Sequence, residues 1–233
     1  MRIALIGYGA MGKLVEAKAH EAGDQIAVIV NEHHAHLDAA ALAESLQIAD
    51  VAVDFSATEA VRRNVEACML AGVPLVEGTT GWNAEREAIE KIVAEHDGAM
   101  IYGANFSIGV NLFFRVAEYA AGLFARFPEY EVFIEEQHHS RKKDSPSGTA
   151  LKLKDLVAGH IKGDISISAT RAGNIPGTHR LGFDGTGDQI LLEHTARSRE
   201  GFAAGALLAA EWVIGKKGVH EFTELMLDIL DAE

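Results

Sequence analysis

One stretch of the sequence, residues 136–149, concentrates side chains that can bind and protonate a small anion. Two imidazoles are adjacent at His138 and His139, and three cationic side chains follow at once: Arg141, Lys142 and Lys143. An imidazole or an ammonium group can exchange a proton with a bound molecule, and a cation also attracts carboxylates. If the two histidines lie on a strand, they point to opposite faces, so only one can reach a given ligand.

The same stretch ends in a turn that leads into a predicted helix. Pro146 favours the turn, and Ser147 can cap the helix, whose apolar positions follow from Ala150 onward. Gly148 allows a ligand to approach the backbone closely, and the hydroxyl of Thr149 lies beside it. Because free N–H groups at the start of a helix bind anions, we expect a carboxylate to bind at Ser147, Gly148 and Thr149.

Local charge distinguishes this stretch from the rest of the chain. The formal net charge is −13, whereas residues 138–154 carry five Lys or Arg side chains against a single carboxylate, Asp144. A cationic patch on an acidic protein is where an anion would dock. A Lys/Arg run taken alone is more often a solvated loop, and the adjacent histidines and the Ser-Gly-Thr turn favour a site. The overall acidity argues against a nucleic-acid partner.

Length and composition narrow the class of protein. The 233 residues, 48% of them hydrophobic, suffice for one large domain or two modest ones. No apolar run approaches the roughly 20 residues of a membrane helix, and from the strand pattern at residue 2 we expect no cationic and apolar leader. Cys68 is the only cysteine, so we expect a cytoplasmic protein without disulfides or membrane association. No Cys/His spacing typical of zinc is present, and we expect no metal.

The N-terminus carries a glycine motif between a strand and a helix. Residues 2–7 read as a buried parallel strand, and a helical pattern follows the motif Gly7, Tyr8, Gly9, Ala10, Met11 and Gly12. In this context Gly7 permits a tight turn, and Gly9 lets the backbone reach a pyrophosphate. Gly12 lets the helix pack close to the strand. The motif predicts a dinucleotide-binding fold.

The choice of dinucleotide is predicted from the end of the second strand. Glu32 follows that strand 20 positions after Gly12, where an acidic side chain can bind the ribose hydroxyls of the adenosine. No Lys or Arg occurs between Lys18 and Arg62, so a 2′-phosphate would find as local cations only His33, His34 and His36. Because histidines are mostly neutral near neutral pH, we expect NADH to be preferred over NADPH.

Three further strand–helix units complete the first half. Strands are expected at 51–55, 74–76 and 99–102, each followed by a polar or glycine-rich turn and a helix. This alternation indicates an α/β fold, a Rossmann-type doubly wound parallel sheet, in which ligands bind at the carboxyl ends of the strands. The turns at 54–56, 78–80 and 105–107 all fall at those ends, so together they would line the cofactor site.

The second half has a different pattern. A helix over 109–126 and a strand over 130–136 precede the 136–149 stretch, and after a helix over 147–159 come strands without helices between them. They include a hairpin around 185–187, so we expect an α+β domain with a mixed open sheet. The predicted domains are 1–107, completed by 200–233, for the dinucleotide, and 108–199 for substrate and oligomer contacts.

The run from Glu136 to Ala150 closely resembles the signature of the 4-hydroxy-tetrahydrodipicolinate reductase family, formerly dihydrodipicolinate reductase. The resemblance extends over essentially the whole chain, including Gly109-Val-Asn111 and residues 202–212. It implies NAD(P)H-dependent reduction of 4-hydroxy-tetrahydrodipicolinate, a small dicarboxylate, to tetrahydrodipicolinate in diaminopimelate and lysine biosynthesis. It also implies a homotetramer assembled through the second domain.

The resemblance also implies roles for individual residues. His138 and Lys142 would be the acid and base catalysts, and the substrate would be bound by His139, Gly148 and Thr149. The cofactor would lie near these loop residues: Gly78, Thr79, Thr80, Gly103, Ala104, Asn105 and Phe106. The glycine motif is one residue shorter than the common form of the family, and this departure bears mainly on the adenosine end of the cofactor site.

Two other readings share some of these features. A dehydrogenase acting on a different small acid would have the same first 107 residues but would not need the 136–149 stretch. A non-catalytic nicotinamide sensor would keep the fold without a proton donor beside the cofactor, and Lys142 with His138 argues against it. Steady NADH consumption would exclude the sensor.

Overall fold

The computed structural model describes residues 1–232, which form two compact units. The first unit comprises Met1–Ile108 and the described residues from Arg199 onward, and the second comprises Gly109–Ser198. Because the chain leaves the first unit once and returns to it, the last helices belong to the same core as the first strand. No helix of the described chain combines the length and apolar character needed to cross a membrane.

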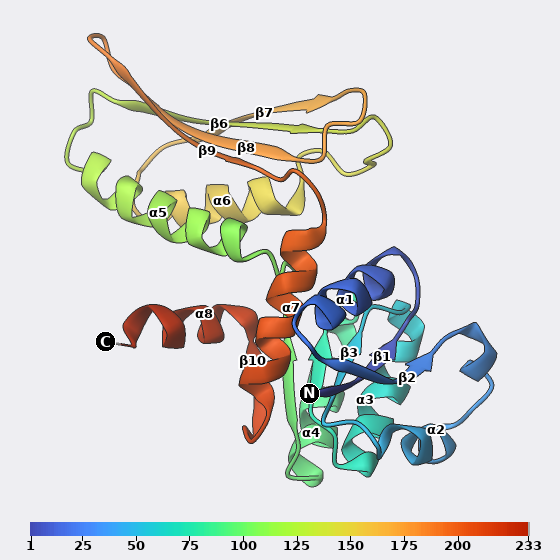
Figure 1. Ribbon diagram of the computed structural model, residues 1–233. Helices are drawn as coiled ribbons and strands as arrows, with labels where there is room; N and C mark the ends of the chain where they lie inside the picture. Colours follow the sequence, from blue (N-terminus) through green and yellow to red (C-terminus); the bar gives the residue numbers. More distant parts are fainter. Residues whose placement is uncertain (233) are drawn as a thin grey trace. The chain divides into compact units, whose positions relative to one another are not determined.

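The first unit is built on a parallel sheet of six strands (Figure 1). In spatial order they are β10 (Gly218–Glu221), β5 (Ala99–Tyr102), β4 (Leu75–Glu77), β3 (Val51–Asp54), β1 (Arg2–Ile6) and β2 (Gln25–Val30). The order reverses between β1 and β3, because the chain passes from the central strand first to one edge and then to the other. Such a reversal opens a crevice at the carboxyl ends of the strands, where α/β proteins bind ligands.

Helices cover both faces of this sheet. The helices α2 (Ala39–Leu46), α3 (Val61–Ala71) and α4 (Arg86–Glu95) pack on one face, and α1 (Ala10–Glu21), α7 (Glu200–Val213) and α8 (Phe222–Asp231) on the other. Three single turns of 3₁₀ helix, η1 (Glu32–His34), η2 (Thr58–Ala60) and η3 (Asn83–Glu85), lie in the connections. The central strands are buried on both faces, which explains their continuous apolar sequences. The predicted doubly wound parallel sheet is confirmed.

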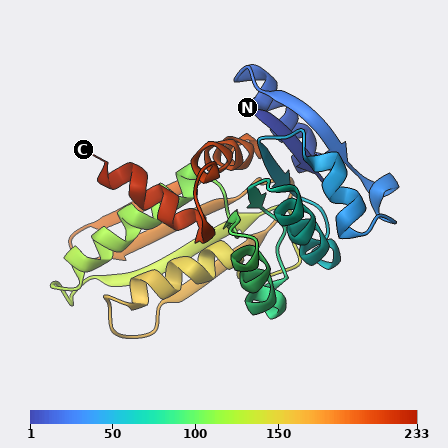
Figure 2. The same ribbon diagram turned by 90° about the horizontal axis from the view of Figure 1, so that it is seen from below.

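The second unit is a four-stranded mixed sheet with two helices on one face (Figures 1 and 2). In spatial order the strands are β7 (Ser166–Arg171), β6 (Glu131–His138), β8 (Thr178–Asp184) and β9 (Gln189–Thr195). Strands β6 and β7 are parallel, and the other pairs are antiparallel. Helices α5 (Ile108–Phe124) and α6 (Gly148–Ala158) lie side by side over Ile134, Leu181 and Phe183. The predicted mixed open sheet is therefore confirmed.

Two elements were not predicted from the sequence. Helix α2 occupies the stretch after Glu32, and Asp38 caps it by accepting a hydrogen bond from the N–H of Ala41 at 2.9 Å. Strand β10 is a four-residue edge strand whose sequence, Gly-Val-His-Glu, has no strong apolar pattern. It is a strand because it pairs in parallel with β5, a contact between positions more than a hundred residues apart.

Close packing between α7 and the chain after β5 depends on one glycine. A Cβ atom at Gly205 would lie 1.7 Å from the carbonyl oxygen of Phe106, so no other residue fits without a backbone shift. Phe106 is itself buried, with its ring centroid 4.8 Å from that of Phe222. The small residues of α7 thus allow the helix to sit directly against the segment that follows β5.

We predict that Gly205→Ala lowers the free energy of unfolding by about 1–3 kcal/mol, the usual cost of overpacking a core. Gly201→Ala, in the same helix, is the matched control, because its Cβ would lie 3.7 Å from the Ser107 hydroxyl oxygen. The control should be neutral or slightly stabilising, since alanine is the better helix former. Urea unfolding followed by circular dichroism measures both, and equal stabilities would contradict the packing argument.

Candidate functional site

A groove of about 540 Å³ opens at the carboxyl ends of the strands of the first unit. Its lining comes from three loops and one helix start: Gly9, Ala10, Met11, Phe55, Ser56, Ala57, Thr58, Glu59, Gly78, Thr79, Thr80 and Arg199. The first loop follows β1, the second β3 and the third β4, which are neighbouring strands. The volume is in the range of sites that hold organic ligands.

The glycine motif has the geometry that a dinucleotide requires. Gly7 has a φ of +85°, and a Cβ there would lie 2.4 Å from the carbonyl oxygen of Phe55. A Cβ at Gly12 would lie 2.2 Å from the carbonyl oxygen of Gly7, which explains the close approach of α1 to the strand end. A Cβ at Gly9 would point into open space, so the backbone there is accessible to a ligand. These features fit a pyrophosphate at the start of α1.

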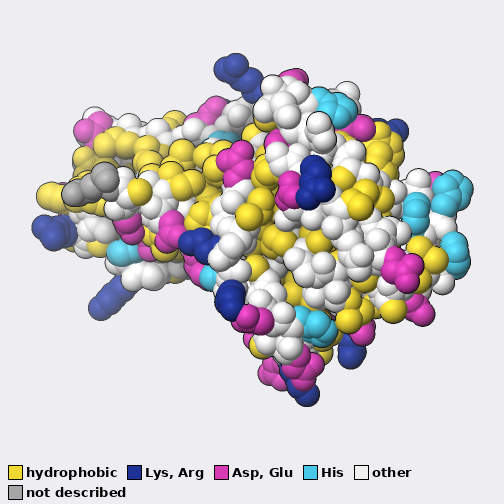
Figure 3. Space-filling model, turned by 60° about the horizontal axis from the view of Figure 1, so that its bottom comes forward, with side chains coloured by type: hydrophobic (Ala, Val, Ile, Leu, Met, Phe, Trp, Pro, Cys, Tyr) yellow, Lys and Arg dark blue, Asp and Glu magenta, His cyan; other side chains and the backbone are white. Residues whose placement is uncertain are grey.

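The segment after β2 contains the acidic residue expected for the adenosine ribose. Glu32 is exposed at the start of η1, one strand away from Gly7, whose N–H donates to the carbonyl of Val30 at 2.8 Å. The Asn31 side chain caps η1 by accepting from the N–H of His33 at 3.1 Å. The exposed histidines of this connection gather at the right-hand edge of the molecule in Figure 3.

A cation absent from the local sequence reaches this segment from α3. The guanidinium of Arg63 donates to the carbonyl oxygens of Ala35 at 3.0 Å and Leu37 at 3.3 Å, and also to the Asn64 side chain. The sequence did not reveal the role of Arg63, because only the packing of α3 beside the β2–α2 connection brings Arg63 close to it. Its donors are divided between these backbone carbonyls and the Asn64 side chain, so it fixes the loop more than it offers a free charge.

The other predicted cofactor residues lie outside the lining of the groove. The Tyr8 hydroxyl donates to Glu16, and the Asn105 side chain accepts from the N–H of Ser107 at 2.9 Å. The Phe106 ring is buried in the core, so this residue can offer a ligand only its backbone. Gly103 and Ala104 belong to the same turn after β5, and a Cβ at Gly103 would lie 3.0 Å from Phe222.

Arg199 brings a cationic residue to the groove. It is the residue before α7, and it lines the groove together with the glycine loop. A guanidinium in that position can pair with a phosphate or carboxylate. Residues 55–59 complete the lining, and their signal in the sequence was the polar turn after the third strand.

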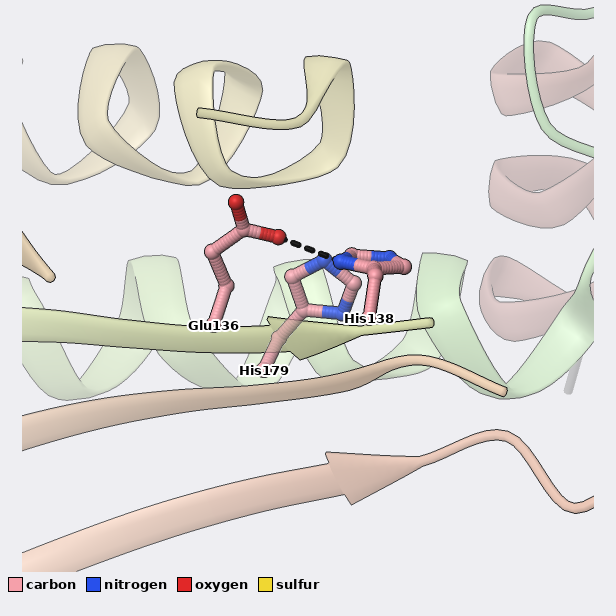
Figure 4. Close-up of side chains that lie close together, drawn as sticks. All are labelled: Glu136, His138 and His179. Carbon is pink, nitrogen blue, oxygen red and sulfur yellow. Dashed lines mark ion pairs between the residues drawn. The ribbon is translucent and has the colours of Figure 1, made fainter. Parts of the chain in front are cut away.

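The second cluster of functional side chains lies in the four-stranded sheet, at the end of β6 (Figure 4). Glu136 and His138 alternate with outward-pointing neighbours and face the helices, with Glu136 only 1% exposed. His179 of β8 is the cross-strand partner of Glu136 and points to the same side. The alternation expected of a strand is present here, and His139 follows directly after the end of β6, where it is half-buried.

The buried carboxylate of Glu136 joins four parts of the chain. Its Oε1 accepts hydrogen bonds from the N–H of Ser147 at 3.0 Å and from Arg171 at 2.6 Å. Its Oε2 lies 2.5 Å from Nδ1 of His138, a contact that does not have hydrogen-bond geometry. Arg171 also donates to the carbonyl of Asp144 at 2.6 Å. These contacts hold together β6, the start of α6, β7 and the loop over residues 139–147, which we call the signature loop.

At the start of α6, the backbone of Gly148 is accessible, whereas the hydroxyl of Ser147 already has hydrogen-bond partners. The buried Ser147 hydroxyl accepts from the N–H of Ala150 at 3.2 Å and lies 3.2 Å from Nε2 of His179. Ser147 thus caps the helix, as its position in the sequence predicted, and its hydroxyl also has a partner in His179. A Cβ at Gly148 would meet nothing within 4 Å, so the backbone there is accessible, with Thr149 next to it.

The cations of the signature loop are in different environments. Lys142 is partly buried and pairs with Asp144 at 2.8 Å, and this pairing lowers the pKa of the Asp144 carboxyl. Arg141 donates to Asn174 at 2.9 Å, and Lys143 is exposed. The ammonium of Lys142 is thus held near the loop backbone, whereas that of Lys143 is not.

Burial controls the protonation of the imidazoles. It lowers the pKa of His138 below its usual value of 6.5, and the charge of Glu136 offsets this only in part. Burial also lowers the pKa of His179 to about 4, with a further contribution from His138. Burial would raise the pKa of Glu136, but the hydrogen bonds from Arg171 and Ser147 outweigh it and hold that pKa low. At neutral pH the arrangement is a carboxylate beside neutral imidazoles.

Glu136, His138 and His179 also form the one group of potential metal ligands found in residues 1–232, with ligand atoms within 4.8 Å of one another. Two observations make it a poor metal site. The Arg171 guanidinium already occupies one oxygen of Glu136, and the other lies 2.5 Å from His138, too close for two ligands of one ion. We therefore interpret the group as a proton-handling cluster.

Comparison with known proteins gives a consistent result over the whole chain. The family model for the dihydrodipicolinate reductase N-terminus matches residues 1–106, and that for the C-terminus matches residues 109–226. A 4-hydroxy-tetrahydrodipicolinate reductase from Christiangramia forsetii is 37% identical over 98% of this chain and 99% of its own length. One from Archaeoglobus fulgidus is 34% identical, over 97% of this chain and its full length.

The fold is also that of solved structures. A dipicolinate-bound dihydrodipicolinate reductase from Paenisporosarcina sp. TG-14 superposes with a TM-score of 0.73, at 23% identity, and covers 95% of this chain and 97% of its own. An amine dehydrogenase from Mycobacterium smegmatis has a TM-score of 0.64 at 11% identity, covering 96% of this chain and 95% of its own. At such identities the likeness concerns the fold alone.

We predict that Glu136→Gln lowers the pKa of His138 further, because it removes the negative charge that favours the protonated imidazole. The pKa is measured by ¹H–¹⁵N NMR of the imidazole, assigned with His138→Asn. Glu135→Gln is the matched control, since Glu135 lies on the other face of β6 and pairs with Arg180. An unchanged or higher pKa in Glu136→Gln would refute the assignment of Glu136 as the controlling charge.

Proposed function

Because this chain belongs to the dihydrodipicolinate reductase family, we infer that it reduces 4-hydroxy-tetrahydrodipicolinate to tetrahydrodipicolinate, on the route to diaminopimelate and lysine. The arrangement of side chains at the end of β6 is the observation that best supports this function. A buried Glu136 there lies against His138, accepts a hydrogen bond from the start of α6, and is linked through Arg171 to the loop that carries Lys142.

The first unit would bind the nicotinamide cofactor in its groove. We propose that the open backbone of Gly9, Ala10 and Met11 receives the pyrophosphate at the start of α1, with Arg199 beside it. Glu32 would bind the ribose of the adenosine. The turns at 78–80 and 103–106 would lie along the nicotinamide half. When bound, the reduced nicotinamide supplies a hydride.

The second unit would bind the dicarboxylate substrate. The N–H groups at Gly148 and Thr149 and the Thr149 hydroxyl are suited to one carboxylate, because they are accessible at the start of a helix. His139 and the Lys142 ammonium would complete the site. Ser147 supports this binding indirectly, since its hydroxyl caps α6 and orients the first turn.

Reduction of the dehydrated ring requires a proton to balance the hydride. Lys142 is the candidate donor, because a lysine side chain can donate a proton and this one is held near the loop by Asp144. His138 is mostly neutral at neutral pH, since burial lowers its pKa, and a neutral imidazole is suited to accept a proton or relay one. The contact with Glu136 restrains the ring of His138.

The outer face of the four-stranded sheet is a candidate surface for assembly. We propose a cytoplasmic homotetramer assembled through the outer face of the four-stranded sheet, which no helix of the second unit covers. That face exposes Leu191 and carries a cross-strand ion-pair network in which Arg180 bridges Glu135 and Glu193. An apolar side chain beside paired charges is a surface suited to self-association.

We propose NADH as the preferred cofactor. Glu32 would repel a 2′-phosphate, and the β2–α2 connection contains no Lys or Arg to attract one. Arg63 is the one strong cation brought to this segment, and its hydrogen bonds to the carbonyls of Ala35 and Leu37 limit what it can offer a phosphate.

We predict that Lys142→Ala reduces turnover by about 10²–10⁴, the usual contribution of a positioned proton donor, with NADH binding nearly intact. The assay is NADH oxidation at 340 nm, with substrate generated in situ by a coupled synthase from pyruvate and aspartate semialdehyde. Lys143→Ala is the control, because that neighbouring side chain is exposed. Turnover unchanged in Lys142→Ala would remove this residue from the mechanism.

We predict that wild-type protein has the higher kcat/KM with NADH, and that Glu32→Gln narrows the ratio by removing the repulsion of the 2′-phosphate. The same assay with NADH and NADPH measures both. Parity of the two cofactors in the wild type would disprove the role given to Glu32. No oxidation of either cofactor by a folded protein that binds NADH would instead favour a dehydrogenase of another acid or a nicotinamide sensor.

A further inference from the structure

Two acidic side chains lie buried in the first unit, outside the chemistry described above. Asp54 ends β3 and Glu77 ends β4, the two residues are register partners in the sheet, and both are 0% exposed. Two carboxylates so close together and removed from water cannot both ionise without a large cost. The pair must either be neutralised by cations or keep a proton.

Each carboxyl group holds one of the loops that line the cofactor groove. Asp54 accepts the N–H of Ser56 at 2.7 Å, and Glu77 accepts the N–H of Thr79 at 2.7 Å. The two loops are also joined directly, since the N–H of Ser56 donates to the Thr79 hydroxyl at 3.1 Å. The positions of both loops in the groove therefore depend on these two side chains.

The groups that face the pair do not neutralise it. From α3, Asn64 donates to Asp54 at 2.7 Å and the thiol of Cys68 lies near both acids. Arg63 reaches only the far side of Asn64. From β5, Tyr102 is the register partner of Glu77, and Arg86 of α4 lies over its ring at 5.0 Å. Glu221 of β10 is the register partner of Tyr102 on its other side and adds a further negative charge.

The hydrogen bonds indicate which of the two acids keeps the proton. Asp54 receives donors from Ser56 and Asn64, which suit a carboxylate. Glu77 receives one, from Thr79, and its Oε2 has no hydrogen-bond partner within residues 1–232. Burial raises the pKa of Glu77 well above its usual range, and the charge of Asp54 adds to this. Burial raises the pKa of Asp54 too, against the effect of its hydrogen bonds.

We propose that Asp54 and Glu77 are positioning residues that share one proton, held mainly on Glu77, and that this proton keeps the loops after β3 and β4 in the shape that binds the dinucleotide. The proposal rests on the proposed function of the groove as the cofactor site. Loss of the proton as pH rises would place two anions side by side under the groove. The loops would then loosen, and the extra charge would repel the phosphates of the cofactor.

The direction of the pH dependence follows from the chemistry. The folded protein favours the protonated form, so stability and dinucleotide affinity are fully present at low pH and decline as pH rises through the folded-state pKa of the pair. Coupling to one proton limits the loss of affinity to about tenfold per pH unit. Glu77→Gln is the test, because the amide is neutral at every pH and keeps an oxygen that can accept the hydrogen bond from Thr79.

The experiment measures the Kd of NADH by fluorescence titration across the neutral to alkaline range for wild type, Glu77→Gln and Asp54→Asn. We expect the wild-type Kd to rise with pH and the Kd of either variant to change within about twofold, since neither variant can form two adjacent anions. Glu66→Gln is the control, because Glu66 is an exposed residue of helix α3. Its Kd should change with pH as that of the wild type does.

A second readout needs no cofactor. The indole N–H of Trp82 donates to the carbonyl of Thr79 at 2.8 Å, so its fluorescence reports on the loop after β4. The only other tryptophan, Trp212, can be replaced by phenylalanine. In the Trp212→Phe background the emission of unliganded protein should change with rising pH, and the change should be absent when Glu77→Gln is added.

The outcomes separate this inference from the proposed function. A wild-type Kd that does not change with pH, or an equal rise in Kd in wild type and Glu77→Gln, would overturn the shared-proton proposal while leaving the groove a cofactor site. Wild-type protein that binds neither NADH nor NADPH at any pH would overturn the cofactor site itself, and the emission of Trp82 would then decide the proton question. If Glu77→Gln does not fold, Asp54→Asn decides it.

Discussion

A carboxyl group buried at the end of a strand must receive hydrogen bonds or keep a proton, and both units of this chain are built around that requirement. In the second unit Glu136 meets it with donors from Arg171 and from the start of α6. In the first unit Asp54 meets it with backbone and amide donors, whereas Glu77 has too few donors to remain ionised. The two units differ because Glu136 has a partner cation, Arg171, whereas the donors to Asp54 and Glu77 are neutral.

The buried carboxyl groups position other side chains and loops without contacting a ligand themselves. Glu136 is inaccessible to substrate, yet it fixes the loop that carries Lys142 and restrains the ring of His138. Asp54 and Glu77 are equally inaccessible, yet they hold the turns that line the groove. The residues proposed to bind ligands are thus supported by buried ones, and a site supported in this way can stay rigid although it consists of loops.

The fold was largely predictable because its signals are local. Continuous apolar strands alternating with helices and interrupted by glycine turns indicated the parallel sheet, and the hairpin around 185–187 indicated the second, mixed one. Helix α2 was missed although Asp38 offered a cap and Ala39–Leu46 a helical composition. Strand β10 could not be found locally, because four mostly polar or small residues become a strand only through pairing with β5.

By itself the sequence determined the residue types and their spacing: a glycine motif after a strand, Glu32 after the next, and His138 and Lys142 in one signature stretch. Tertiary structure decided their partners. It brought Arg171 and His179 across the sheet to Glu136, and Arg63 from α3 to the β2–α2 connection. It also committed Ser147 to capping and buried the Phe106 ring. Hydrogen bonds and burial depend on contacts between residues far apart in the chain, and no local pattern encodes those contacts.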